Sequence, residues 1–189
     1  MVTLVMACMF MGGWGVIQFA KWRHAVNYPY GQSHCCDKIL SLALYNFASI
    51  HGGVFPTGEA TPEASLSLLY KAGFVDANTL RGKSVPETTV QEILDRGELL
   101  GPDSCGWHYV EGLRTDSDRR FALFWDKAGL GHNGELLRDG GHIVCFVYGD
   151  TRHIPASEWP KFLADQKELH DQLEKKNAEA KTNDLEEKH

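Results

Sequence analysis

Side chains that could do chemistry are concentrated in one stretch near the end of the chain. Between Phe121 and Ile154 the sequence holds three histidines, three aspartates and one cysteine among apolar, strand-like runs. Imidazoles and carboxylates bind metal ions and transfer protons, so this stretch is the first candidate for a functional site. The residues nearest to the expected hairpin ends, where side chains could converge, are His132, Asp139, His142, Asp150 and His153.

Turn chemistry offers a second explanation for the same aspartates. In Asp139-Gly140-Gly141 and in Gly149-Asp150, glycine supplies a positive φ and aspartate bonds to its own backbone, as chain reversals require. The chain also lacks HExxH, CxxC and any pair of histidines at helical ligand spacing, which are the patterns of zinc sites. The sequence therefore leaves open whether these aspartates are ligands or turn residues.

The elements that would position this stretch begin with an apolar segment. Val2–Ala20 carries no charged side chain, and a helix of this length just spans the roughly 30 Å hydrocarbon core of a bilayer. The basic and aromatic run KWRH follows at once, a composition typical of the membrane interface. The sequence predicts a membrane anchor over residues 1–24 and a linker over residues 25–34, with a buried helix of a soluble fold as the alternative.

Helical periodicity follows the linker. Asp37 favours a helix start and Gly52-Gly53 favours its end. Shorter helices are predicted within residues 62–74 and 85–101. The apolar residues that recur at steps of three and four, as on one helix face, are Ile39, Leu40, Ala43, Leu44, Phe47, Ala48 and Ile50.

From Trp107 the pattern changes to that of strands. Three short runs, GWHYVEGL, FALFWD and HIVCFVYG, are aromatic and β-branched and are bounded by turn residues. They predict a meander of about three antiparallel strands, in which alternate residues of the last run face opposite sides of the sheet. Helices first and strands later are the α+β pattern. The aromatic residues expected to pack against the preceding helix are Trp107, Tyr109, Phe121, Phe124, Trp125, Phe146 and Tyr148.

The chain ends in a charged segment that is rich in helix formers. Phe162, Leu169 and Leu173 make a thin apolar stripe along it. The pattern predicts a solvated helix to about Ala180 with a frayed end, as a tail over residues 159–189 that is separate from the main domain.

Composition narrows the class of protein. A length of 189 residues with 43% apolar and 23% charged side chains suits one domain with extensions. A net charge of −6, without any basic run interleaved with aromatic residues, argues against nucleic-acid binding. No glycine-rich phosphate loop occurs, and no small-molecule substrate is inferred. Cys35 or Cys36 could pair with Cys105 in an oxidising compartment, which spacing alone does not decide.

Two blocks of the sequence resemble the type IV pilin-like and type II secretion pseudopilin-like proteins that are abundant in Planctomycetes and related bacteria. In the first block, SHCCDKILSLALYNFASIHGGVFP is similar to the helix and Gly-rich exit turn of that family, and ASLSLLYKAGFVD continues in register. In the second, FALFWDKAGLGH and GGHIVCFVYGDTRHIPASEW are similar to its C-terminal hairpin, where a histidine precedes a Gly turn. Together the blocks cover residues 33–163.

The resemblance implies a fold, a location and a role. The fold would be a pilin-like α+β domain over residues 35–158, with the amphipathic helix packed on a small antiparallel sheet. The role would be that of a non-catalytic assembly or interaction component of a secretion or pilus-type system in the cell envelope. Its partners would be membrane lipid, through Val2–Ala20, and other envelope proteins. The soluble domain would face out of the cytoplasm, although the positive-inside rule taken alone points the other way.

Calcium is the cofactor that the resemblance implies. Related pseudopilins hold a calcium ion with loop carbonyls and aspartates, a ligand set that suits a hard cation. In this chain the candidate ligands are Asp126, Asp139 and Asp150.

The chain departs from true prepilins at its start. MVTLVMACMFMGG has neither the Gly-Phe processing site nor the glutamate of the mature prepilin helix. The resemblance therefore implies the fold more firmly than processing into a pilus.

A cysteine hydrolase is the alternative from another class of protein. GGHIVCFVYGD also resembles the His-bearing strand of papain-like bacterial peptidases. In that scheme Cys36 would be the nucleophile, since a helix N-terminus lowers a thiol pKa, with His142 as base and Asp150 as its orienting partner. The segment around Cys36 lacks the Gln and Gly-rich turn of an oxyanion hole, so we expect no catalytic activity.

Overall fold

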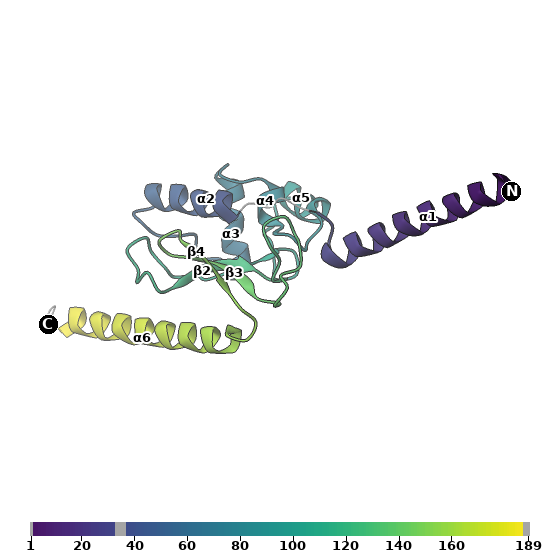
Figure 1. The fold of residues 1–189 in the computed structure, drawn as a ribbon. Coiled ribbons are helices and arrows are strands. Elements are labelled where there is room, and N and C mark those ends of the chain that lie inside the picture. The colour runs from purple at the N-terminus through teal and green to yellow at the C-terminus, as the bar shows by residue number, and fades with distance from the viewer. Residues whose placement is uncertain (1, 33–36, 187–189) are drawn as a thin grey trace.

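The computed structural model describes the backbone of residues 2–32 and 37–186 and the side chains of residues 14–32 and 37–176. Within these ranges the chain is an α+β structure with six helices and a four-stranded antiparallel sheet, as the sequence predicted for the fold class (Figure 1). The helices are α1 (Val2–Asn27), α2 (Asp37–Ile50), α3 (Pro62–Lys71), α4 (Ala77–Leu80), α5 (Glu87–Asp95) and α6 (Trp159–Glu186). The strands are β1 (Trp107–Tyr109), β2 (Ala122–Asp126), β3 (His142–Phe146) and β4 (Thr151–Ile154).

The sheet is a simple meander. Its strand order is β1-β2-β3-β4, and every neighbouring pair is antiparallel. The three strand-like runs of the sequence correspond to β1, β2 and β3, and β4 was expected only as the second arm of the C-terminal hairpin that the resemblance implies. The sequence of β4, TRHI, is mostly polar, and three of its four side chains are exposed, so it carries no alternation of apolar and polar residues. Its pairing with β3 makes it a strand, and pairing is a non-local property.

A bulge in β2 decides which side chains face which side of the sheet. The register shifts between Ala122 and Phe124, so β2 has one residue more than the stretch of β3 opposite it. As a result Leu123 and Phe124 both join a larger core on the helix side, whereas Ala122 and Trp125 belong to a smaller core on the other side.

In β3 the predicted alternation is confirmed. Cys145 and the following Val147 lie in the larger core, and Val144 and Phe146 lie in the smaller one. The prediction that all the aromatic residues face α2 is wrong in part, because Trp125 and Phe146 lie on the opposite face. It is also wrong for Tyr148, which is 64% exposed in the turn after β3.

The larger core lies between the sheet and helices α2 to α5. From α2 it takes the buried face, Leu40, Ala43, Leu44, Phe47 and Ala48. Ile39 and Ile50 were predicted on this face, but they are 50% and 68% exposed. The reason is geometric. At about 100° per residue, their separation brings both residues back to the same side of the helix, which faces away from the core.

The smaller core is closed by α6, which runs along the far face of the sheet (Figure 1). Trp159 and Phe162 pack against it, and Leu169 and Leu173 reach the edge of the larger core. The predicted apolar stripe is therefore confirmed, but its description as part of a solvated tail is wrong. The stripe is used against the sheet, so the packed fold continues past the predicted boundary at residues 158/159.

The first helix projects from the body of the molecule (Figure 1). It extends to Asn27, three residues past the predicted end of the anchor, and the Asn27 carbonyl accepts a hydrogen bond from the Leu136 N–H (2.8 Å). In the part of the chain that the structure describes, no helix is both long enough and apolar enough to cross a membrane. The side chains of residues 2–13, most of the predicted span, lie outside the described residues.

Candidate functional site

The structure buries one cluster of charged side chains in the larger core. The Lys83 ammonium lies 3.0 Å from Oδ1 of Asp37, and the two side chains are 1% and 11% exposed. Asp126 completes the cluster and is 2% exposed. Charges that are this deeply buried cost free energy unless they are paired, and the contact of Lys83 with Asp37 provides that pairing.

Asp126 is held by the backbone around it. Its Oδ2 accepts a hydrogen bond from the N–H of Lys83 (3.0 Å) and its Oδ1 from the N–H of Ala128 (2.9 Å). Burial raises the pKa of the Asp126 carboxyl above its ordinary value, and the positive charge of Lys83 and the two N–H donors partly offset that rise. Asp126 therefore takes up a proton more readily than a surface aspartate does.

Two glycines allow Lys83 to enter the core. Gly82 has a φ of +60°, and a Cβ at this position would lie 2.8 Å from the backbone of Gly106. A Cβ on Gly106 would lie 2.1 Å from the carbonyl oxygen of Arg81. The loop before Lys83 therefore packs directly against the segment that leads into β1, which a side chain at either glycine would prevent. The Lys83 ammonium then lies 5.4 Å from the centre of the Trp107 ring.

The sequence did not reveal this cluster. Asp37 was interpreted as a helix-start residue, and Lys83 lies in a loop between Gly82 and Ser84 where a surface position is the usual one. The partners are 46 residues apart in the chain. No local pattern links them, so only the fold could bring them together.

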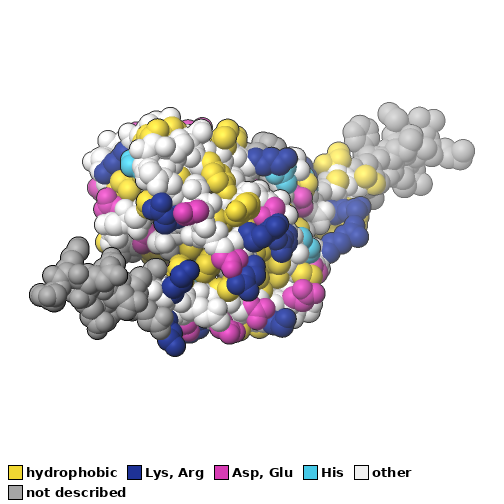
Figure 2. All heavy atoms as spheres, turned by 90° about the vertical axis from the view of Figure 1, so that its left-hand side faces the viewer, with side chains coloured by type: hydrophobic (Ala, Val, Ile, Leu, Met, Phe, Trp, Pro, Cys, Tyr) yellow, Lys and Arg dark blue, Asp and Glu magenta, His cyan; other side chains and the backbone are white. Residues whose placement is uncertain are grey.

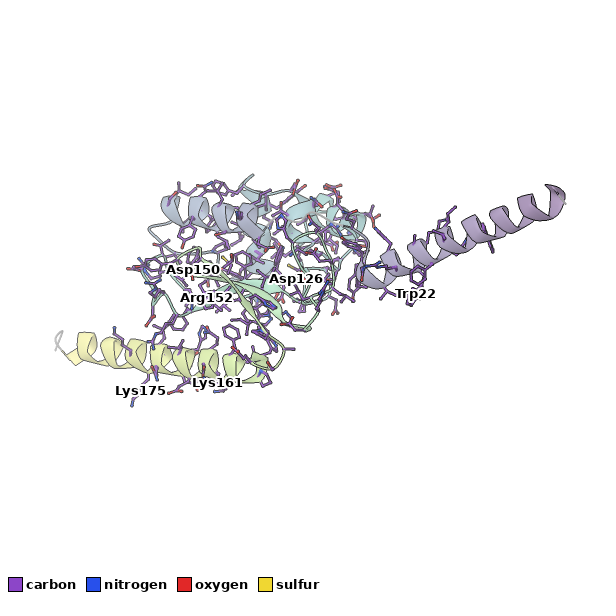
Figure 3. All side chains as sticks on the ribbon, in the orientation of Figure 1. Trp22, Asp126, Asp150, Arg152, Lys161 and Lys175 are labelled. Carbon is purple, nitrogen blue, oxygen red and sulfur yellow. The ribbon has the colours of Figure 1, made fainter. Side chains whose placement is uncertain are left out.

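The three aspartates predicted as calcium ligands do not converge. Asp126 lies in the core, Asp139 is 3.2 Å from His153, and Asp150 pairs with Arg152 at 2.9 Å. Figure 3 shows Asp126 and Asp150 at separate places along the sheet. Among the described residues, no three His, Cys, Asp or Glu side chains are placed to hold a metal ion.

One oxygen near the β3–β4 turn lacks a partner. Oδ1 of Asp150 is buried and accepts no hydrogen bond from the described residues. Calcium takes six to eight oxygen ligands, so this single atom does not make a calcium site. The residues present do not fit the predicted ion.

The proposed hydrolase residues are also separated. His142 opens β3 and pairs with Ile154, whereas Asp150 lies in the turn at the other end of the same hairpin. Four strand residues of about 3.3 Å each span the length between these ends. The His142 ring stacks on Trp159 of α6 at 4.0 Å, and its Nδ1 donates to the Asp126 carbonyl (3.0 Å). His142 and Asp150 therefore form no pair, and Cys36 lies outside the described residues.

The two cysteines that the structure describes are buried thiols. Cys105 and Cys145 are both free, so the pairing of Cys105 with Cys35 or Cys36, which the sequence left open, is not formed. Cys35 and Cys36 themselves lie outside the described residues. Burial raises the pKa of both described thiols to about 12. A thiol of that pKa is a poor nucleophile at neutral pH, which suits packing and not catalysis.

Exposed apolar side chains gather on α1. Figure 2 shows them beside basic side chains where this helix leaves the body. Figure 3 shows the Trp22 side chain projecting from the side of α1. Six large apolar residues here are between 47% and 70% exposed: Trp14, Val16, Ile17, Phe19, Trp22 and Val26.

A second exposed apolar group lies on the outer face of α2. Ile39, Leu42 and Ile50 are 50%, 62% and 68% exposed. At about 100° per residue, these three positions share one side of the helix, which is turned away from the centre of the buried face. The two helices nearest to the start of the chain thus carry most of the exposed large apolar residues among those that the structure describes.

Comparisons of this chain with protein-family models, with curated protein sequences and with solved structures found no match.

Proposed function

We propose that this chain is a non-catalytic, membrane-anchored assembly protein of the cell envelope, similar to the pseudopilins, in which α1 is the anchoring and packing element. The observation that carries this proposal is the exposure of large apolar side chains on every side of α1. Trp14, Ile17 and Phe19 lie at about 0°, 300° and 140° around the helix axis. A helix that is apolar all round is stable only when lipid or other helices surround it.

The charge distribution of the same helix supports the proposal. The segment Val2–Ala20 has no charged side chain, and Lys21 and Arg23 follow it directly. Basic and aromatic residues at the end of an apolar helix hold it at the membrane interface. The body then lies close to the membrane surface, because Asn27 of α1 is hydrogen-bonded to Leu136.

Membrane fractionation tests the anchor. We expect the full chain to remain with the membrane after an alkaline wash, and the chain without residues 1–27 to become soluble and stay folded. The double variant Met9→Asp, Phe10→Asp should also be released, because both residues fall near the centre of the Val2–Ala20 segment, where a charge costs about 2.5–3.5 kcal/mol. The matched control is Leu163→Asp, an exposed leucine on α6, which should leave the chain in the membrane. A full chain found in the soluble fraction would contradict the anchor.

Photo-crosslinking in intact membranes tests assembly. A photoreactive residue at Ile17 should join this chain to a second copy or to another envelope protein, and the same residue at Leu163 should not. A reporter enzyme attached after His189 should be active outside the cytoplasm. Equal crosslinking from both positions would contradict a role for α1 in assembly, and a reporter active only inside the cytoplasm would contradict the proposed orientation.

A further inference from the structure

The buried cluster places an amine and a carboxyl in contact. Nζ of Lys83 lies 3.0 Å from Oδ1 of Asp37, and 46 residues separate the two in the chain. Two reactive groups that a fold holds at this distance react as if at very high concentration, with effective molarities of about 10⁵–10⁸ M for well-oriented pairs. The same contact that makes the ion pair therefore also places the amine of Lys83 where it could react with the carboxyl of Asp37.

Solvent is excluded from both groups. Lys83 is 1% exposed, the Asp37 side chain is 11% exposed, and the Trp107 ring lies beside the ammonium. Two charges removed from water carry a large desolvation penalty, which a neutral product would not carry. Condensation of the pair to an amide would therefore relieve the cost of burying them.

The hydrogen bonds of Lys83 point the same way. An ammonium has three N–H donors, and within the described part of the chain its one hydrogen-bond acceptor is Oδ1 of Asp37. An amide nitrogen keeps a single N–H. A covalent link would leave fewer buried donors without a partner than the ion pair does.

A second carboxyl lies next to the pair. Asp126 binds the backbone N–H of Lys83, and its pKa responds to the charges of both Lys83 and Asp37. Because burial raises that pKa, Asp126 is suited to accept a proton and to give it back.

We propose that Lys83 and Asp37 form an intramolecular isopeptide bond. The Lys83 ammonium first gives one proton to Oδ1 of Asp37 along their hydrogen bond. The uncharged Nζ then attacks Cγ of the protonated carboxyl, a C–N bond forms, and the C–O bond to the protonated oxygen breaks. The nitrogen loses its second proton, which Asp126 relays to the departing oxygen, and that oxygen leaves as one molecule of water. The ammonium and the carboxylate together become a neutral amide, so atoms and charge balance without any oxidant or co-reactant.

The bond would connect the start of α2 to the loop that follows α4. Asp37 opens α2, the first helix of the body after α1, and Lys83 lies in the loop that follows α4. The closed loop would contain α2, α3 and α4. Tension applied through α1 would then pass to the body through a covalent link at the start of α2.

Mass spectrometry of the purified full chain, reduced and denatured, tests the bond. We expect a mass below that of the sequence by one molecule of water, and a protease digest that contains one branched peptide joining Lys83 to Asp37. In Lys83→Met the deficit should disappear. The matched control is Lys38→Met, which removes the exposed lysine next to Asp37 and should keep both the deficit and the branched peptide.

The wild-type result decides the question even if Lys83→Met does not fold. A wild-type mass equal to that of the sequence would overturn the proposal. A deficit that persists in folded Lys83→Met, or a digest in which the peptides of Lys83 and Asp37 are both linear, would overturn it as well.

Discussion

The two faces of the sheet are sealed in different ways. On the helix side, α2 to α5 enclose a core in which Trp107 and Phe124 are each 1% exposed, together with the buried Lys83–Asp37 pair. On the other side a single helix, α6, contributes Trp159 and Phe162, both of which are partly buried.

Because of this difference, we expect the two faces to open at different free energies. A core built from several elements is lost only when the whole fold opens, whereas one helix held by a few partly buried contacts can detach by itself. The helix face should therefore set the global free energy of unfolding, and the α6 face should open locally. The following predictions test that contrast.

The largest effect is expected for Phe124→Ala. This ring packs edge-on against Trp107 at 5.4 Å between centres, and its loss leaves a cavity that should cost about 3–5 kcal/mol of unfolding free energy. Denaturant titration measures the loss. Cys105 and Cys145, whose pKa values burial raises to about 12, should become open to thiol reagents together, as located by peptide mapping. A loss below about 1 kcal/mol would contradict the assignment of global stability to this face.

A smaller and local effect is expected for Trp159→Ala. Trp159 contacts the Trp125 ring edge-on at 5.6 Å but is only partly buried, so the cost should be about 1–3 kcal/mol. Limited proteolysis should cut α6 more quickly, while Cys145 on the helix side stays protected from labelling. If Cys145 became labelled as fast as α6 is cut, the two faces would open together.

Gln166→Ala should have a smaller effect again. The Gln166 side chain accepts from the N–H of Ala122 (2.8 Å) and donates to the carbonyl of Arg120 (3.0 Å), which ties α6 to the start of β2. Loss of these bonds leaves the N–H of Ala122 without its partner and should cost about 1–2 kcal/mol. Gln172→Ala is the control, because among the described residues Gln172 bonds to the exposed Glu168 on its own helix and not to the sheet. Equal losses in the two variants would show that the tie to β2 does not hold α6.

The smallest effect is expected for Asp118→Asn, on the surface. The hydrogen bond from Arg120 lowers the pKa of Asp118 from 3.8 to about 2. A carboxyl whose pKa is lowered by folding adds stability above its unfolded pKa, and that stability is lost as pH falls through the folded value. The variant should thus be slightly less stable than the wild type at about pH 5, and the difference should shrink as pH falls through about 2, as measured by urea titration. A difference that grows as pH falls would contradict this assignment.

Much of the fold was predictable where neighbouring residues in the chain decide the outcome. Leu40, Leu44 and Phe47 repeat at helical spacing, and they form the buried face of α2. Cys145 and Phe146 alternate in β3, and they point to opposite cores. Periodicity is a local property, so a sequence shows it directly.

The candidate site was predicted less well, for a physical reason. Asp126, Asp139 and Asp150 share a turn-rich context, but which partner each one meets depends on strand register and on chain reversals. The three aspartates were expected to meet because they lie in similar turn-rich segments, but in the structure each one has a different partner.

The sequence by itself determined the α+β class, the apolar character of the first helix and the core face of α2, because composition and spacing along the chain specify them. Only the tertiary structure decided the burial of Lys83 beside Asp37, the extra residue in β2 and the docking of α6 on the far face of the sheet. Each of these depends on contacts between residues far apart in the chain. Such contacts stabilise the protein only after the sheet has brought the residues together.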